Sequence, residues 1–392
     1  MKSTLKKSII FILIVALLNI FTVFADIDVS NDIRAAISGD FETGEIFYEY
    51  NTDEVVEIAS ITKLMTYLVA REAVEKGEVS FDDIVTISEN AASTKGSSFG
   101  LSLGEDIKLG LLMDVILIVS GNDAAVAIAE HVSGSEEAFV ERMNKKAVEI
   151  GITTARFINP NGMPIDLEET DQNYMSTVDL FKLARYVLEE YPEITNTTDK
   201  EKLAIPERNY DKEATNPLLE EMNAVDGLKT GYTDRAGLCL ISTAEVIDEE
   251  DSNKNRRVIS IVMGAKSHMD RIQKSLDLIE YGMYDYGKEK LLSKDDLVDT
   301  ISVPNAVEMI LEVQPETNYY HLVKKDTEIK EIFNYENYEN KAPINKGEVV
   351  GEVEIYVEDE YLDTVNLVAS RDVKKAGFFE RAFRYLRGIF YK

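Results

Sequence analysis

Three short segments of the chain contain residues whose types and spacing could perform acyl transfer at a serine. They are Ser60-Ile-Thr-Lys63, Ser120-Gly-Asn122 and Lys229-Thr-Gly231, in that order along the sequence. A serine hydroxyl is a weak nucleophile until a nearby base takes its proton, and a neutral lysine can be that base. The order of the segments is typical of serine sites whose base is a lysine rather than a histidine.

The first segment is expected to open a helix. Apolar residues at helical spacing predict a helix over 59–76, so Ser60 and Lys63 lie on one face within hydrogen-bond reach. A lysine is ordinarily charged at neutral pH, so the site must lower the pKa of Lys63 by burial and by a second cation nearby. We expect Lys229 to be that cation. The positive end of the helix dipole also favours an anion developing at Ser60.

None of the three segments is specific alone. A serine and a lysine three residues apart occur by chance in most chains of this length, Ser-Gly-Asn is an ordinary turn, and Lys-Thr-Gly is an ordinary strand end. Their conjunction is informative, because the order, the spacing and the expected contexts of helix start, inter-helix turn and strand agree with one site architecture.

A mixed α/β body near residues 30–290 is expected to position these segments. Apolar alternation and turn residues predict strands over 33–37, 45–50, 225–244 and 257–264. Helical spacing predicts helices over 59–76, 109–119, 123–132, 136–150, 177–190 and 269–286.

The pattern changes from about residue 300 to short alternating runs separated by Gly, Pro, Asn and acidic turns, which predicts an all-β accessory domain. The expected strands are 300–303, 309–313, 319–323, 349–357 and 364–369. The tyrosine- and asparagine-rich stretch 332–340 is interpreted as an exposed loop.

The N-terminus has the pattern of a bacterial secretory signal peptide. Lys2, Lys6 and Lys7 precede an apolar run over 9–24, and cleavage is expected after Ala25. The alternative is a retained membrane helix, although the run is short for a span of roughly 20 residues. Removing the three lysines changes the formal charge from -30 to -33. So acidic a mature chain argues against nucleic-acid binding.

The C-terminus is basic, unlike the rest of the chain. Residues 371–392 contain seven basic residues against two acidic ones. A helix from Gly377 would gather apolar residues on one face: Phe378, Phe379, Ala382, Phe383, Leu386, Ile389 and Phe390. We expect it to lie in a membrane surface, held by apolar burial and by attraction of its arginines to lipid phosphates. The alternative is a terminal helix that docks on its own domain.

Other chemistry is disfavoured. Cys239 sits in an apolar strand-like run and is interpreted as a buried, inert thiol. The histidines at 131, 268 and 321 have no metal-ligand spacing, so neither a zinc site nor a histidine triad is expected. The segment Gly96-Ser-Ser-Phe-Gly100 satisfies the G-x-S-x-G pattern of esterases, but the preceding residues lack a strand pattern, so it is interpreted as a loop.

The chain resembles the low-molecular-mass penicillin-binding proteins of the serine D-alanyl-D-alanine carboxypeptidase family. The resemblance extends beyond the motif triplet through nearly the whole mature chain, and is carried by 59–66, 120–125, 157–162, 215–219 and 225–233, with 346–351 in the second domain. It implies a penicillin-binding-protein-like domain, with a helical cluster and an antiparallel sheet, then a small all-β domain. We expect a signal peptide over 1–25, a catalytic domain over 26–290, a β-rich domain over 298–370 and a membrane-anchoring helix over 374–392.

The resemblance also implies roles for individual residues. Ser60 would be the acylated nucleophile, Lys63 its base and Ser120 a proton relay to the leaving D-alanine. The residues implied to bind substrate are Asn122 for the amide, Lys229 for positive potential, Thr230 and Arg271 for the terminal carboxylate, and the backbone N–H groups of Ser60 and Tyr232 for the oxyanion. Gly231 is expected to be glycine because a side chain would obstruct the bound peptide. No metal or cofactor is implied.

The substrate implied is a peptidoglycan stem pentapeptide ending in D-Ala-D-Ala, with β-lactams acylating the same serine at the outer face of the cytoplasmic membrane. Asn161, Met163 and Met175 depart from the usual family pattern, and we expect them to alter the cleft wall without touching the core catalytic residues. Two alternatives stay open. One is a class A-like β-lactamase, which Gly121 in place of the usual aspartate argues against. The other is a sensor that acylates without turnover.

Overall fold

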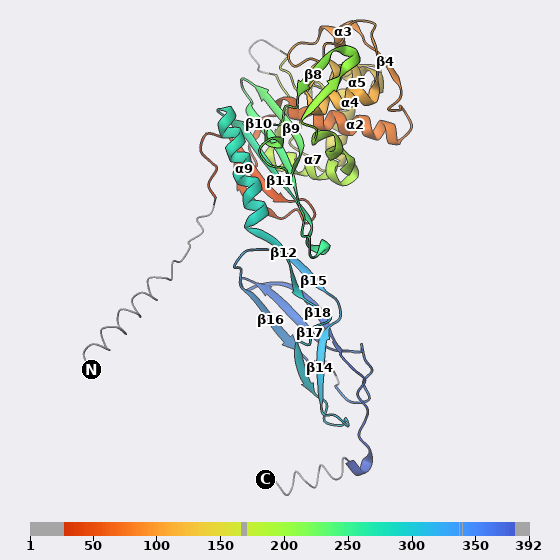
Figure 1. Cartoon of the computed structure of the whole chain (residues 1–392), viewed down its shortest axis with the longest axis vertical. Helices are drawn as coiled ribbons and strands as arrows, with labels where there is room; N and C mark the ends of the chain where they lie inside the picture. Colours follow the sequence, from red (N-terminus) through yellow and green to blue (C-terminus); the bar gives the residue numbers. More distant parts are fainter. Residues whose placement is uncertain (1–26, 166–170, 337, 339, 381–392) are drawn as a thin grey trace, which may run out of the picture.

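The computed structural model describes residues 27–165, 171–336, 338 and 340–380. These residues form a larger N-terminal domain of helices and strands and a smaller domain made of strands (Figure 1). The expected signal peptide over 1–25 and most of the expected anchoring helix over 374–392 lie outside the described residues. None of the described helices is both long and apolar enough to cross a membrane.

A five-stranded antiparallel sheet forms the centre of the N-terminal domain. Its strands follow the order β2-β1-β11-β10-β9. They are β1 (Ala35–Asp40), β2 (Ile46–Tyr50), β9 (Val225–Thr233), β10 (Gly237–Val246) and β11 (Arg256–Ala265). The sheet confirms the strands that apolar alternation predicted, with one long stretch divided into β9 and β10 by a turn.

Both faces of this sheet are covered. Alternate residues of each strand point to opposite sides, so each strand contributes side chains to the cores on both faces. Ile37, Ile259 and Ile261 pack into the large core shared with the helical cluster. Val258 and Val262 instead belong to the smaller cores beneath helix α9 (His268–Tyr284). Figure 1 shows α9 on one side of the sheet and the helical cluster on the other.

The helical cluster carries two of the three motif segments. Its longer helices are α2 (Lys63–Glu75), α4 (Leu109–Ile118), α5 (Asn122–Ser133), α6 (Glu136–Glu149) and α7 (Thr177–Glu190), with short α3 (Glu89–Ser93) and α8 (Thr195–Thr198). Serine side chains start α6 and α7, because Ser135 and Ser176 each accept a hydrogen bond from a backbone N–H of the first turn. Gly134, whose positive φ suits glycine, caps the C-terminal end of α5.

Three short antiparallel strand pairs were not predicted. They are β3 (Val55–Glu57) with β6 (Tyr174–Ser176), β4 (Ile84–Thr86) with β5 (Asp106–Lys108), and β7 (Lys202–Ile205) with β8 (Tyr210–Glu213). Strands of three or four residues are too short to show a period of two, so the sequence does not distinguish them from loops.

The second domain is all-β, as predicted. One sheet has the order β13-β14-β18-β17-β16. Its strands are β13 (Asp299–Ser302), β14 (Ile310–Pro315), β16 (Ile329–Asn334), β17 (Val349–Val357) and β18 (Glu360–Ala369). The interpretation of 332–340 as a loop is wrong over 332–334, which belong to β16. This strand lies at the sheet edge, where water contact permits the Lys330-Glu331 pair that hid its alternation.

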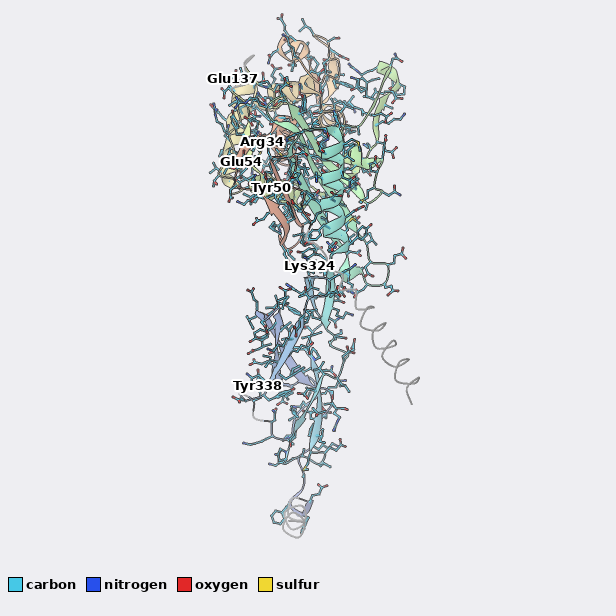
Figure 2. All side chains as sticks on the ribbon, turned by 90° about the vertical axis from the view of Figure 1, so that its left-hand side faces the viewer. Arg34, Tyr50, Glu54, Glu137, Lys324 and Tyr338 are labelled. Atoms are coloured by element: carbon cyan, nitrogen blue, oxygen red, sulfur yellow. The ribbon has the colours of Figure 1, made fainter. Side chains whose placement is uncertain are left out.

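A direct junction joins the two domains. Only Asp285 separates α9 from β12 (Tyr286–Leu292), which pairs with β15 (Tyr319–Lys324). Arg256 Nη2 donates to three carbonyl oxygens there, those of Gly282 (2.7 Å), Met283 (3.1 Å) and Tyr286 (2.8 Å). Lys324, labelled in Figure 2, lies where the two domains meet.

Candidate active site

A cavity of about 580 Å³ opens between the helical cluster, β9 and the start of α9. Its lining includes most of the predicted site residues. The residues around it are Ser60, Ser97, Ser120, Thr215, Thr230, Gly231, Tyr232, Leu238, Lys266, Ser267, His268 and Arg271. Three predicted residues, Lys63, Asn122 and Lys229, are buried and contact residues of this lining.

Ser60 and Lys63 are hydrogen-bonded to each other. Ser60 lies in a 3-10 turn, η1 (Ala59–Thr62), that leads into α2, so the pair spans the junction of turn and helix. Lys63 is fully buried, and its Nζ donates to Ser60 Oγ (2.8 Å), Asn122 Oδ1 (2.7 Å) and the carbonyl oxygen of Asn161 (2.7 Å). None of these acceptors is a carboxylate, so no ion pair from residues 27–165, 171–336, 338 or 340–380 stabilises the charged amine.

The pKa of Lys63 is lowered well below its ordinary value. Burial is the larger cause and the charge of Lys229 is the second, while Asp123 acts in the opposite direction. These are the two causes that the sequence predicted. A lysine with a lowered pKa is neutral at a lower pH, and a neutral amine can accept the Ser60 proton.

Ser120 lines the cavity and contacts Lys229. It lies between α4 and α5 with a positive φ of 61°, which turns the chain so that its hydroxyl faces β9. Lys229 Nζ donates to Ser120 Oγ (3.0 Å) and to the carbonyl oxygen of Thr230 (2.9 Å). Burial, and then the charge of Arg271, lowers the pKa of Lys229 to about 7.

Arg271 and Thr230 lie at the α9 end of the cavity. Arg271 is 7% exposed, and the Nε atom of its guanidinium has no hydrogen-bond partner within the described part of the chain. Burial lowers its pKa. Thr230 Oγ1 donates to Thr215 Oγ1 (2.7 Å). A carboxylate only accepts hydrogen bonds, so the Thr230 hydroxyl must rotate away from Thr215 to donate to a ligand carboxylate in the cavity. A buried guanidinium without a carboxylate partner is a suitable binding group for a ligand carboxylate.

Gly231 also has a packing reason to be glycine, which the sequence did not predict. A Cβ atom at this position would lie 3.0 Å from the carbonyl oxygen of Ile58 and 3.1 Å from Ile61 Cγ1, which belong to the serine-bearing turn and its flank. The glycine therefore permits β9 to pack closely against that turn. Tyr232 follows, with its side chain exposed and its backbone paired with Leu238 of β10.

Residues 161 and 162 are functional neighbours that the sequence reasoning missed. The carbonyl oxygen of Asn161 contacts Lys63, so the expectation that Asn161 touches no core catalytic residue is wrong. The contact is made by the backbone, which any residue could supply. Gly162 has a φ of +82° and packs against Ala59, the residue before Ser60. Gly162 belongs to segment 157–162, one of the segments that carry the family resemblance, and this was the sequence signal that it lies near the site.

The disfavoured sites have ordinary structural roles. Residues 96–100 form a loop with no strand before them, which confirms that they are not an esterase elbow. Cys239 is buried, and burial raises the pKa of its thiol to about 11, as expected of an inert cysteine.

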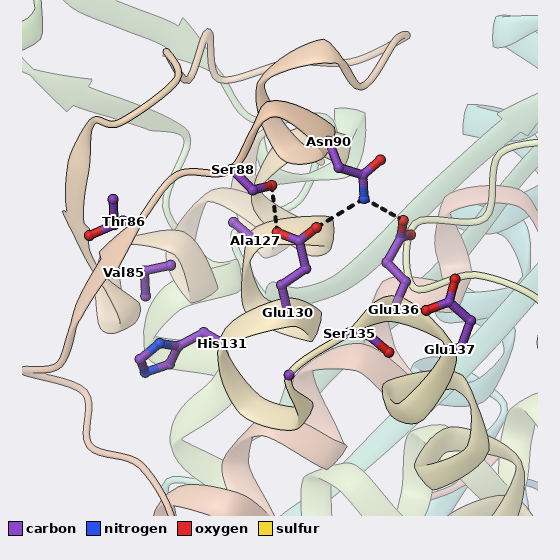
Figure 3. A pocket seen from close by; sticks show the side chains of 11 residues that line it. Val85, Thr86, Ser88, Asn90, Ala127, Glu130, His131, Ser135, Glu136 and Glu137 are labelled. Atoms are coloured by element: carbon purple, nitrogen blue, oxygen red, sulfur yellow. Dashed lines mark hydrogen bonds between the residues drawn. The ribbon is translucent and has the colours of Figure 1, made fainter.

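A second cavity of about 460 Å³ is lined by Glu130, Glu136 and Glu137 (Figure 3). No lysine is among the residues lining it, so it lacks a serine–lysine pair.

Comparisons with known proteins identify the family of the chain. Sequence models of two families match the chain: D-alanyl-D-alanine carboxypeptidase over residues 24–267, and penicillin-binding protein 5, C-terminal domain, over residues 286–375. The D-alanyl-D-alanine carboxypeptidase DacF of Bacillus subtilis is 33% identical over 359 residues, covering 90% of this chain and 88% of its own. DacC of Escherichia coli is 28% identical over 377 residues, covering 93% and 90%.

Solved structures show the same relationship. The D-alanyl-D-alanine carboxypeptidase DacD of Francisella tularensis has a TM-score of 0.67 at 30% identity, covering 90% of this chain and 95% of its own. Penicillin-binding protein D2 of Listeria monocytogenes, in its ampicillin-bound form, has a TM-score of 0.56 at 31% identity, covering 64% and 96%. The chain therefore belongs to the D-alanyl-D-alanine carboxypeptidase family and is a serine-type hydrolase with a penicillin-binding-protein fold.

Proposed function

We propose that the protein removes the terminal D-alanine from peptidoglycan stem pentapeptides through an acyl-enzyme on Ser60. The observation that carries this assignment is the 2.8 Å separation of Lys63 Nζ and Ser60 Oγ, with the lysine buried and without a carboxylate partner among the described residues. A neutral amine has two N–H groups, which suit the oxygens of Asn122 and Asn161, and one lone pair, which is left for the serine proton.

Acylation begins with that proton transfer. Lys63 accepts the hydroxyl proton as Ser60 Oγ attacks the carbonyl carbon between the two D-alanines. The backbone N–H groups of Ser60 and Tyr232 stabilise the oxyanion. When the C–N bond breaks, the proton passes through Ser120, which Lys229 holds by a hydrogen bond, to the leaving amine. The products are free D-alanine and an ester on Ser60.

Substrate binding uses the remaining polar groups of the cavity. Arg271 and Thr230 hold the terminal carboxylate, and the positive potential of Lys229 supports them. Asn122 Nδ2 donates one hydrogen to the carbonyl oxygen of Lys95 (2.9 Å), which leaves its second hydrogen for a substrate amide oxygen. Water then attacks the ester, Lys63 takes a proton from that water, and Ser60 recovers its hydrogen as the shortened peptide leaves.

β-Lactam antibiotics are proposed to acylate the same serine, because their strained amide occupies the position of the scissile peptide bond. The Listeria relative described in an ampicillin-bound form supports this proposal by similarity. Slow hydrolysis of that ester would make the antibiotic an inhibitor rather than a substrate.

D-alanine release from an N-acylated Lys-D-Ala-D-Ala peptide tests the proposal. The mature chain should release D-alanine, and Ser60→Ala should not. Benzylpenicillin is measured in parallel, because rapid repeated turnover would indicate a β-lactamase, and stable acylation without D-alanine release would indicate a sensor. Either result would overturn the assignment as a carboxypeptidase.

Attachment to the outer face of the cytoplasmic membrane through residues 374–392 is a separate proposal. Two observations support it: Phe378 and Phe379 are 73% and 87% exposed, and the C-terminal end of the described chain lies at the end of the second domain that faces away from the N-terminal domain (Figure 1). Such exposure argues against docking on the second domain. The mature chain should co-sediment with vesicles containing anionic lipid, whereas a chain ending at Ala376 should not, with equal D-alanine release by both as the control. Equal co-sedimentation would refute the anchor.

A further inference from the structure

The loop Lys95–Leu101 forms part of the wall of the active-site cavity, and Ser97 is the residue by which it lines that cavity beside Ser60 and Ser120. The proposed mechanism assigns no role to this loop. Its conformation is nevertheless fixed closely by one buried side chain, that of Asp123, which directly follows Asn122, the last residue of the second motif.

Asp123 is 1% exposed and holds the loop through both carboxylate oxygens. Oδ1 accepts the backbone N–H of Phe99 (3.0 Å). Oδ2 accepts the backbone N–H groups of Gly100 (2.9 Å) and Leu101 (3.2 Å) and the hydroxyl of Ser98 (2.6 Å). Four donors from consecutive residues therefore converge on one carboxylate, which is a charge-assisted anchor rather than a surface contact.

The loop in turn accepts hydrogen bonds from the side chain and the backbone of Asn122. The N–H of Asn122 donates to the carbonyl oxygen of Ser97 (2.7 Å), and its Nδ2 donates to that of Lys95 (2.9 Å). A Cβ atom on Gly96 would lie 2.6 Å from Asn122 Nδ2, so the loop backbone also packs directly on the amide. The amide orientation is thus set by the loop.

Asn122 then meets the base, because its Oδ1 accepts from Lys63 Nζ at 2.7 Å. We infer that Asp123 is a positioning residue for acylation, which acts by holding the loop against Asn122 and so fixes the amide that orients Lys63 and the substrate. The inference rests on the proposed function, in which Lys63 is the base and Asn122 a substrate ligand.

A second set of contacts holds the outer side of the same loop. In the β7–β8 hairpin, Arg208 Nη2 donates to the carbonyl oxygen of Gly100 (3.1 Å) and Lys212 Nζ to that of Ser98 (3.4 Å). Arg208 also stacks over the ring of Phe99, 4.4 Å from its centroid. Loss of the Asp123 anchor should therefore shift the loop rather than unfold it.

The test compares Asp123→Asn with a matched control. Asp179 is also 1% exposed and also anchors a loop, accepting the N–H groups of Thr153 and Thr154 (both 3.0 Å), but none of its partners lines the cavity. We expect Asp123→Asn to lower the rate constant for benzylpenicillin acylation roughly ten- to a hundredfold, since misplacing a reacting group by about 1 Å can cost a hundredfold. Asp179→Asn should keep the wild-type rate constant, whatever its melting temperature.

A double-mutant cycle separates positioning from a general loss of stability. If Asp123 acts through Asn122, the variant with Asn122→Ala and Asp123→Asn together should be no slower than Asn122→Ala alone. A fall that multiplies the two single effects would overturn the inference, as would a wild-type rate in Asp123→Asn or an equal loss in Asp179→Asn.

Ser98→Ala removes one of the four donors without changing any charge, so it keeps the inference testable even if Asp123→Asn does not fold. It should slow acylation several-fold, and again only while Asn122 is present. Failure of the wild-type chain to release D-alanine or to bind benzylpenicillin would instead count against the proposed function itself.

Discussion

Replacing Gly162 by alanine should nearly abolish acylation of Ser60. Gly162 has a φ of +82°. Real Cβ atoms essentially never lie within 3.0 Å of another heavy atom, and an added Cβ here would lie more than 1 Å inside that limit from the carbonyl oxygen of Ala59. The same methyl would lie 2.9 Å from Thr62 Oγ1. One of the two backbones must therefore move by about 1 Å or more.

The displaced groups belong to the reaction centre on either side. Ala59 precedes the nucleophile Ser60, and Asn161, next to Gly162, supplies the carbonyl oxygen that binds Lys63. A displacement of about 1 Å in a catalytic group can cost about a hundredfold in rate. The left-handed backbone adds about 1–2 kcal/mol of instability for any residue other than glycine.

The assay is the second-order rate constant for benzylpenicillin acylation, measured with the thermal unfolding curve of each variant. Gly77→Ala is the matched control, because Gly77 has a φ of +70° but nothing within 4 Å of an added Cβ. It should lose stability and keep its rate. Gly231→Ala, with its closest contact at 3.0 Å, should lie between the two. A Gly162→Ala rate within threefold of wild type, or an equal loss in Gly77→Ala, would refute the reasoning.

Three further predictions concern buried cations. Burial holds the pKa of Lys229 at about 7 in the folded protein, against about 10.4 in unfolded chains. The cost of burying this charge to the free energy of unfolding is therefore full below pH 7 and declines as the pH rises towards 10.4. Urea unfolding should therefore show Lys229→Met more stable than wild type at pH 7, by less at pH 9, and its residual acylation should need a higher pH because Lys63 loses a neighbouring charge. Arg271→Gln should raise KM for the D-Ala-D-Ala peptide by about tenfold to a hundredfold, the value of a charge-assisted hydrogen bond, and an unchanged KM would exclude it from carboxylate binding. Arg256→Ala should cost about 3 kcal/mol in urea unfolding, because buried carbonyl groups lose their donor, while D-alanine release at 25 °C keeps its rate.

The helices and the central sheet were predictable because their apolar periods are long. The expected helix over 177–190 coincides with α7, and the other expected helices differ from the observed ones by at most four residues at either end. The three motifs were also predicted to meet, since each carries a side chain whose chemistry requires the others. Structure then supplied the distances that join Ser60 with Lys63 and Ser120 with Lys229.

What the sequence could not predict depends on backbone atoms and on packing. The carbonyl oxygen that binds Lys63 has no signature at position 161, since every residue carries one. The steric reason for Gly231 required the position of the turn behind β9. The loop over 95–101 reads as polar and irregular, because its order comes from Asp123, a side chain more than twenty residues away.

Helix α9 has a mechanical consequence for the whole molecule. Its 17 residues make a rigid rod of about 25 Å, with Arg271 near one end and the junction to β12 at the other. Arg256 of β11 joins that junction to the central sheet by hydrogen bonds, and only one residue separates α9 from β12. A force that pulled the second domain away from the first would act on α9, the helix that carries Arg271. Stretching of the protein and binding of the peptide carboxylate therefore depend on the same helix.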